Sequence, residues 1–165
     1  REEVRSKYRE VAVNPHGDFH FHTGRPLAKR LGYDDALVAN LPDIAVESFA
    51  GVANPFSLRP LTAGEHVVDV GSGAGFDSFV AAQHVASTGR VVGVDMTEEM
   101  LSKARSTAVT KGFDHGEFRQ GLDEELPVEN GAAAMVISNW EINRVSDIER
   151  VRMQVHTMLR PDRQI

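Results

Sequence analysis

The sequence has no cysteine, no long apolar run and no cluster of basic residues. Without cysteine, the chain has no disulfides, no thiolate metal sites and no cysteine nucleophile. No apolar stretch approaches the roughly 20 residues that a membrane-spanning helix needs. The charged N-terminus, Arg1 to Glu10, does not resemble a secretory signal. We therefore expect no membrane contact and a cytoplasmic location.

The charge balance argues against nucleic acid as a partner. The 24 acidic residues outnumber the 18 lysines and arginines, and the formal net charge is −6. Proteins that grip a nucleic-acid backbone normally present a basic stripe, so a small-molecule partner is expected instead. Apolar residues make up 41% of the 165 residues and charged residues 25%, as in an ordinary globular domain with a packed core.

From residue 64 onward, short β-branched runs alternate with helical stretches, which is typical of βαβ units. The predicted strands are 66–70, 90–94, 116–119 and 133–138, and the predicted helices are 75–86, 97–111 and 146–159. This pattern predicts an α/β fold, a Rossmann-like, doubly wound and mostly parallel sheet. Residues 163–165 resemble the start of a fifth strand, so we expect the sheet to be truncated there.

The N-terminal third has a different character. Short helical patterns over 26–32, 33–41 and 43–50 are separated by Pro42 and other turn residues. We expect residues 1–60 to form a helical cap on the acceptor side and 61–165 to form the ligand-binding core, both within one domain.

A glycine-rich turn carries the functional prediction. Residues 67–75 read VVDVGSGAG, so a strand leads through Gly71, Gly73 and Gly75 into a helix. Such a turn lets a ligand approach the backbone and the helix N-terminus. The second predicted strand is followed by Asp95, whose carboxylate can accept hydrogen bonds from both ribose hydroxyls. A dinucleotide site would require glycine at Phe76, which disfavours a dehydrogenase.

In this form the chain resembles class I S-adenosylmethionine-dependent methyltransferases. The segments AVESFAGVANPF (45–56), VVDVGSGAGFDSFVAA (67–82), VVGVDMTEEMLSKAR (91–105) and VISNWEIN (136–143) are similar to those of arsenite methyltransferases and their relatives. The resemblance implies S-adenosylmethionine as the cofactor. It implies that the cofactor-binding residues are Asp69, Gly71, Ser72, Gly73 and Gly75 at the methionine end, Asp95 at the ribose, Met96, Leu122 and Asp123 at the adenine, and Asn139 near the reacting methyl.

The likeness does not extend to arsenic chemistry. Arsenite methyltransferases resemble one another in holding trivalent arsenic with cysteine thiols, and here Trp140 stands where one such cysteine is usual. We therefore expect methyl transfer to an organic small molecule, with Trp140 as an aromatic wall or as plain packing. The alternative is a degenerate relative that holds the cofactor, or nothing, without turnover.

The catalytic candidates are His20, His22 and Glu141, which could deprotonate or orient an acceptor. Asp18, His20 and His22 alternate, so on a strand they would share one face and could contact a metal ion. Since no fourth ligand is evident, we expect a loop or lid there and no metal. An unpaired sheet edge is usually covered, so we expect either a homodimer or coverage by the N-terminal region.

Overall fold

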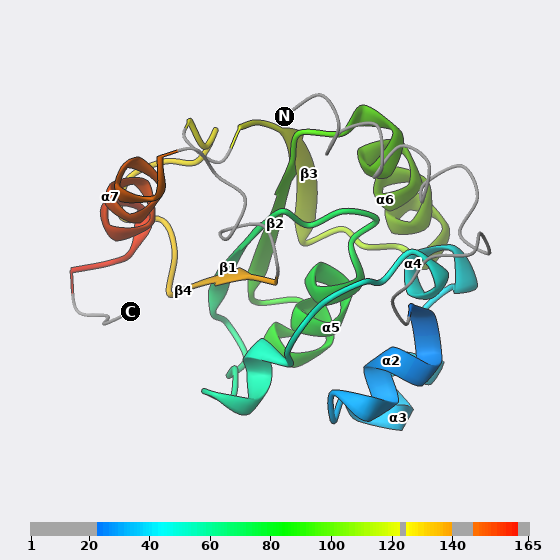
Figure 1. Ribbon diagram of the computed structural model, residues 1–165. Coiled ribbons are helices and arrows are strands. Elements are labelled where there is room, and N and C mark those ends of the chain that lie inside the picture. The colour runs from blue at the N-terminus through cyan, green and yellow to red at the C-terminus, as the bar shows by residue number, and fades with distance from the viewer. Residues whose placement is uncertain (1–22, 123–124, 140–146, 162–165) are drawn as a thin grey trace.

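Four parallel strands form the centre of the protein. The computed structural model describes residues 23–122, 125–139 and 147–161, and within them one sheet has the strand order β3-β2-β1-β4 (Figure 1). The strands are β1 (His66–Val70), β2 (Arg90–Asp95), β3 (Gly116–Gln120) and β4 (Met135–Ser138). The predicted strands therefore agree with the structure to within two residues.

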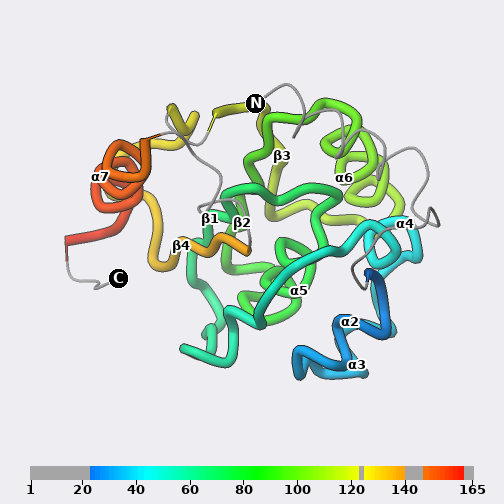
Figure 2. Tube along the Cα trace, in the orientation of Figure 1, coloured from blue at the N-terminus to red at the C-terminus, as the bar shows by residue number. Residues whose placement is uncertain are grey.

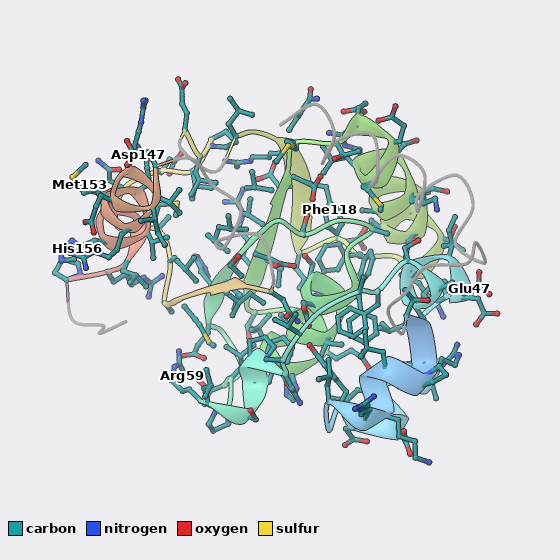
Figure 3. All side chains as sticks on the ribbon, viewed as in Figure 1. Glu47, Arg59, Phe118, Asp147, Met153 and His156 are labelled. Atoms are coloured by element: carbon teal, nitrogen blue, oxygen red, sulfur yellow. The ribbon has the colours of Figure 1, made fainter. Side chains whose placement is uncertain are left out.

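Helices cover both faces of this sheet, as predicted for a doubly wound fold. Val67 and Val91 pack with residues of α5 (Phe76–Val85) on one face. Their neighbours Val68 and Val92 pack on the other face with Met158 of α7 (Ile148–Met158). α6 (Glu98–Lys111) lies on the same face as α5 and apart from α7 (Figure 2). Met153 and His156 lie on the outer side of α7, away from the sheet (Figure 3).

The boundaries of α6 follow from its sequence. Thr97 precedes the helix with extended backbone, and Gly112 ends it in the left-handed region at φ 62°. Glycine adopts this conformation without a steric penalty, which is why it often ends helices. Met100, Leu101 and Ala104 are buried, and their spacing places them on the one face of the helix that packs on the core.

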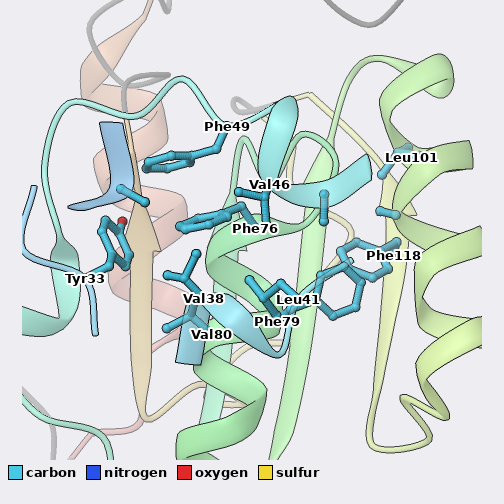
Figure 4. Packing of buried hydrophobic residues seen from close by; sticks show 13 residues of the cluster. Tyr33, Val38, Leu41, Val46, Phe49, Phe76, Phe79, Val80, Leu101 and Phe118 are labelled. Carbon is cyan, nitrogen blue, oxygen red and sulfur yellow. The ribbon is translucent and has the colours of Figure 1, made fainter. Parts of the chain in front are cut away.

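The N-terminal helices are α2 (Gly24–Arg30), α3 (Asp35–Ala39) and α4 (Asp43–Glu47), followed by the short 3₁₀ helix Pro55–Ser57. They pack against the core through one shared hydrophobic cluster. Phe49 stacks on Phe76 with ring centroids 3.9 Å apart, and Tyr33 meets Phe76 edge-on at 5.1 Å (Figure 4). The helical segments predicted before residue 60 are thus confirmed, and their apolar side chains continue the core.

The chain starts to extend the sheet beyond β4 immediately after α7. Leu159 has extended backbone and forms a parallel bridge with Ala133, and the Arg160 N–H donates to the Ala133 carbonyl at 2.9 Å. This pairing begins before the predicted fifth strand at 163–165, because α7 ends at Met158; residues 162–165 lie outside the described ranges. Among the helices of the described residues, none has the length and apolar character to cross a membrane.

Candidate functional site

The candidate site lies at the carboxyl ends of β1, β2 and β4. In the order β3-β2-β1-β4, the chain leaves β1 toward β2 on one side, whereas β4 lies on the other side of β1. Open α/β sheets bind ligands at such a switch point, outside the carboxyl ends of the strands. The glycine turn 71–75 follows β1 there, and Asn139 follows β4.

Backbone hydrogen bonds fix the glycine turn. The N–H groups of Gly71 and Ser72 donate to the Val94 carbonyl at 2.8 and 2.9 Å, which ties the turn to β2. Gly75 has φ 88°, and a Cβ added to it would lie 2.7 Å from Phe79 Cε2. Gly73 has φ 53°, but a Cβ there would meet no atom of the described residues within 4 Å. Gly75 therefore packs against the core, whereas Gly73 borders open space.

Asp95 joins the end of β2 to the same turn. Its Oδ2 accepts from the Gly73 N–H and its Oδ1 from the Thr97 N–H, both at 2.8 Å. Burial raises the pKa of the Asp95 carboxyl above its ordinary value, although these two donors and the Thr97 side chain oppose the shift. Since a carboxylate offers about four lone-pair sites, about one of them is left to accept a hydrogen bond from a ligand.

The turn has the features that the predicted cofactor requires. The Ser72 hydroxyl is buried and has no hydrogen-bond partner in the described part of the chain, and such orphaned groups generally require an explanation. The space beside Gly73 lets a ligand approach the backbone, and Asp95 supplies acceptors for hydroxyl groups. Ser72, Gly73 and Asp95 therefore fit S-adenosylmethionine.

Two buried carboxyls lie behind the turn. Asp69 on β1 accepts from the Ser78 hydroxyl at 2.6 Å, and Asp77 in the first turn of α5 accepts from the Tyr33 hydroxyl at 2.6 Å. Burial raises the pKa of Asp69 to about 8, with a further contribution from the nearby charge of Asp77. Burial also raises the pKa of Asp77 to about 6, against the opposing hydrogen bonds from Tyr33 and Asn139.

Asn139 connects this region to the N-terminal segment. Its Oδ1 accepts from the N–H groups of Val52 and Ala53 at 2.8 and 3.2 Å. Its Nδ2 donates to the Ala53 carbonyl at 2.8 Å and to Asp77 Oδ2 at 2.9 Å, and it lies 3.2 Å from the Tyr33 hydroxyl oxygen. The end of β4, the start of α5 and the N-terminal segment therefore meet at one side chain.

The structure places most of the predicted cofactor-binding residues around this edge of the sheet. Those on β1, on the glycine turn, at the end of β2 or directly after β2 are Asp69, Gly71, Ser72, Gly73, Gly75, Asp95 and Met96. Leu122 follows β3 and is 43% exposed. His20, His22, Asp123, Trp140 and Glu141 lie outside the described residues, as does Asp18. In the ranges that are described, no group of three His, Cys, Asp or Glu side chains could hold a metal ion.

Tyr33, Asp77 and Ser78 are functional candidates that the sequence analysis missed. An aspartate in the first turn of a helix is common, because its negative charge interacts favourably with the helix dipole. The residue type of Asp77 therefore does not by itself indicate a function. Its position directly after the glycine turn was the available clue. Tyr33 had no such clue, because it lies 44 residues from its partner in the sequence.

The comparisons with known proteins agree with this geometry. Residues 61–165 match the family model described as a methyltransferase domain. An arsenite methyltransferase from Halobacterium salinarum is 43% identical over 81% of this chain and 34% of its own length. Another, from Aquipseudomonas alcaligenes, is 37% identical over 59% of this chain and 30% of its length. The chain thus spans about one third of these curated relatives.

A solved structure gives the same result. An arsenic(III) S-adenosylmethionine methyltransferase from Chlamydomonas reinhardtii superposes with a TM-score of 0.71 and 34% identity, over 78% of this chain and 45% of that one. The residues matched by the family model, 61–165, include the sheet and the glycine turn. The predicted Rossmann-like fold and the family resemblance are therefore confirmed. This chain belongs to the methyltransferase-domain family, whose cofactor is S-adenosylmethionine.

Proposed function

We propose that this protein is an S-adenosylmethionine-dependent methyltransferase that acts on a small organic acceptor. The observation that carries the proposal is the hydrogen bond between the Gly73 N–H and Asp95, which joins the glycine turn to the carboxylate at the switch point of the sheet. Arsenite methyltransferases among the relatives support a small-molecule acceptor. The remaining expectations, a cytoplasmic location and a homodimer, are separate predictions.

The cofactor would supply a methyl group already activated on a sulfonium. The chain then has mainly to bind, to align the acceptor and to exclude water. Ser72 and Gly73 would hold the methionine end, Asp95 the ribose, and Met96 and Leu122 the adenine. A base is required only for an acceptor that must lose a proton, and His20, His22 and Glu141 stay the candidates for it.

Asp95→Ala is expected to weaken S-adenosylmethionine binding by about ten- to a hundredfold, the worth of one or two charge-assisted hydrogen bonds. Isothermal calorimetry should find one site per wild-type chain. Glu98→Ala is the matched control, because Glu98 is an exposed acid on α6 paired with Arg105. Equal affinity in wild type and Asp95→Ala would contradict the assignment of Asp95. A folded wild type that binds neither S-adenosylmethionine nor S-adenosylhomocysteine at millimolar concentration would contradict the proposed function.

Arsenite is expected to be a poor acceptor for this chain. Trivalent arsenic is a soft centre that prefers thiolates, and the sequence offers five methionine thioethers but no thiol. The assay incubates the protein with labelled cofactor and either arsenite with glutathione or a panel of small aromatic and amine acceptors. Transfer to an organic acceptor alone supports the proposal, and rapid, saturable formation of methylarsenic overturns this prediction. Cofactor binding without any transfer would favour the non-catalytic alternative.

A further inference from the structure

A buried polar cluster fastens the N-terminal segment to the strand ends. We define the Tyr33–Asp77–Asn139 cluster by its three side chains, which come from the N-terminal region, from α5 and from the end of β4. Tyr33 and Asp77 are 5% and 6% exposed. Their hydrogen bonds span 44 to 106 residues of sequence, so the cluster joins parts of the chain that no local structure holds together.

The Asn139 carboxamide pairs with the backbone of residues 52 and 53 in both directions. Its oxygen accepts from two N–H groups, while its nitrogen donates to the Ala53 carbonyl. The remaining amide hydrogen points to Asp77 Oδ2, whose other oxygen accepts from Tyr33. The carboxamide therefore has its donors and acceptors matched on both sides, which fixes its orientation.

The backbone at residue 51 leaves no room for a side chain beside this cluster. A Cβ added to Gly51 would lie 2.5 Å from Asn139 Nδ2 and 2.7 Å from the Phe49 ring. That ring is stacked on Phe76 at 3.9 Å and cannot yield freely. The backbone of residues 51–53 therefore lies in close contact with Asn139. The hydrogen bonds between Asn139 and residues 52 and 53 require this short distance.

We propose that Asn139 is a positioning residue that clamps residues 51–53 onto Asp77, and so fixes the wall of the methyl-transfer site on the side of the N-terminal segment. The role of Asn139 in methyl transfer rests on the proposed function. The link is Asp77, which lies two residues after Gly75, the last glycine of the turn. The clamp itself is a statement about structure, and it can be tested without any acceptor.

The first variant is Asn139→Asp, which replaces the donor that faces Asp77 with an acceptor. Two carboxyl oxygens then face each other where Nδ2 and Oδ2 lie 2.9 Å apart, while the oxygen that accepts from Val52 and Ala53 is kept. Adding Asp77→Asn restores a carboxamide–carboxylate pair at this contact, with donor and acceptor reversed. The Ala53 carbonyl, which accepts from Asn139 Nδ2 at 2.8 Å in the wild type, still lacks its donor in the double variant. Asn40→Asp is the matched control, because Asn40 is exposed on the N-terminal region and bonds only weakly, to Gln83 at 3.3 Å.

Hydrogen exchange of the Val52 and Ala53 amides is the readout. In Asn139→Asp the two hydrogen bonds donated by Nδ2, to Asp77 and to the Ala53 carbonyl, are lost, so residues 52 and 53 should separate from the core more often. Their amides should then exchange about tenfold faster or more, while amides of β1 and β2 keep their wild-type protection. The S-adenosylmethionine dissociation constant should rise by a similar factor. The Asp77→Asn/Asn139→Asp double variant should recover part of both effects, because it restores the contact with residue 77 but not the hydrogen bond to the Ala53 carbonyl. Asn40→Asp should show neither effect.

The outcomes separate the clamp from the function. Unchanged exchange at residues 52 and 53 in Asn139→Asp overturns the clamp, whatever the protein binds. Faster exchange spread evenly over the strands also overturns it, because that result indicates a general structural role. A double variant that recovers no part of either effect overturns it too. If the exchange results hold but wild type binds no cofactor, the proposed function fails while the clamp stands.

Discussion

Raising the pH from about 5 to about 9 is expected to lower the free energy of unfolding of the ligand-free protein by a few kcal/mol, and Asp69→Asn should remove most of this dependence. Asp69 is 2% exposed, and burial raises its pKa from an ordinary 3.8 to about 8. Its neighbour Asp77 has its pKa raised to about 6. At pH values between 3.8 and these raised pKa values, the folded state binds more protons than the unfolded state.

The sign follows from that difference in bound protons. Stability rises with pH only where the unfolded state binds more protons, so here it falls. The contribution from Asp69 is fully present below about pH 4 and is lost as the pH rises toward 8, with a smaller loss from Asp77 near pH 6. Asp69→Asn keeps an oxygen that can accept from Ser78, while it removes the buried charge.

Urea unfolding at a series of pH values measures this effect. The difference between wild type and Asp69→Asn isolates one carboxyl from the other ionisable groups, because those groups are the same in both proteins. Asp114→Asn, at an exposed aspartate in the turn before β3, should follow the wild-type curve. Parallel curves for wild type and Asp69→Asn would show that the carboxyl is not protonated in the folded state, and would contradict the prediction.

The strands and the glycine turn could be predicted from sequence because their signals are local. The β-branched run at His66–Val70 and the glycines at 71, 73 and 75 determine neighbouring structure directly. Where a boundary differed, at the start of β4, the reason is tertiary: Ala133 pairs with Leu159 after α7 rather than within a regular ladder. No local pattern encodes that contact.

The buried cluster could not be predicted for the same reason. Asn139 was selected by resemblance to lie near the reacting methyl, but its hydrogen bonds to residues 52 and 53 span 87 and 86 positions. Tyr33 lies between α2 and α3, and Asp77 lies in the first turn of α5, where an acidic residue is common. The partners of such side chains become visible only when the N-terminal helices are packed on the core.

The second large expected effect concerns the glycine turn. Alanine at Gly75 should lower stability, whereas alanine at Gly73 should lower the affinity for the cofactor. Gly75→Ala places a methyl group 2.7 Å from the Phe79 ring and 2.8 Å from the Phe118 ring at φ 88°. Both rings are buried. Overpacking together with left-handed strain should cost about 3 kcal/mol or more, which corresponds to a fall in melting temperature of roughly 10 °C.

Gly73→Ala is expected to preserve the fold and to weaken cofactor binding by a hundredfold or more. Its Cβ meets no atom within 4 Å, so the cost to stability should be only the left-handed strain of about 1–2 kcal/mol. The methyl group would occupy the space that lets a ligand reach the turn. Gly112→Ala is the matched control, because Gly112 has φ 62° and equally open surroundings at the far end of α6.

Thermal unfolding and calorimetry with S-adenosylhomocysteine separate the three variants. Gly112→Ala and Gly73→Ala should lose similar stability, but only Gly73→Ala should lose affinity, by a hundredfold or more on the scale of about 1.4 kcal/mol per tenfold. Gly75→Ala should melt lowest of all. If Gly73→Ala binds as tightly as Gly112→Ala, the space beside Gly73 does not receive the cofactor, and the ligand would have to lie elsewhere along the carboxyl ends of the strands.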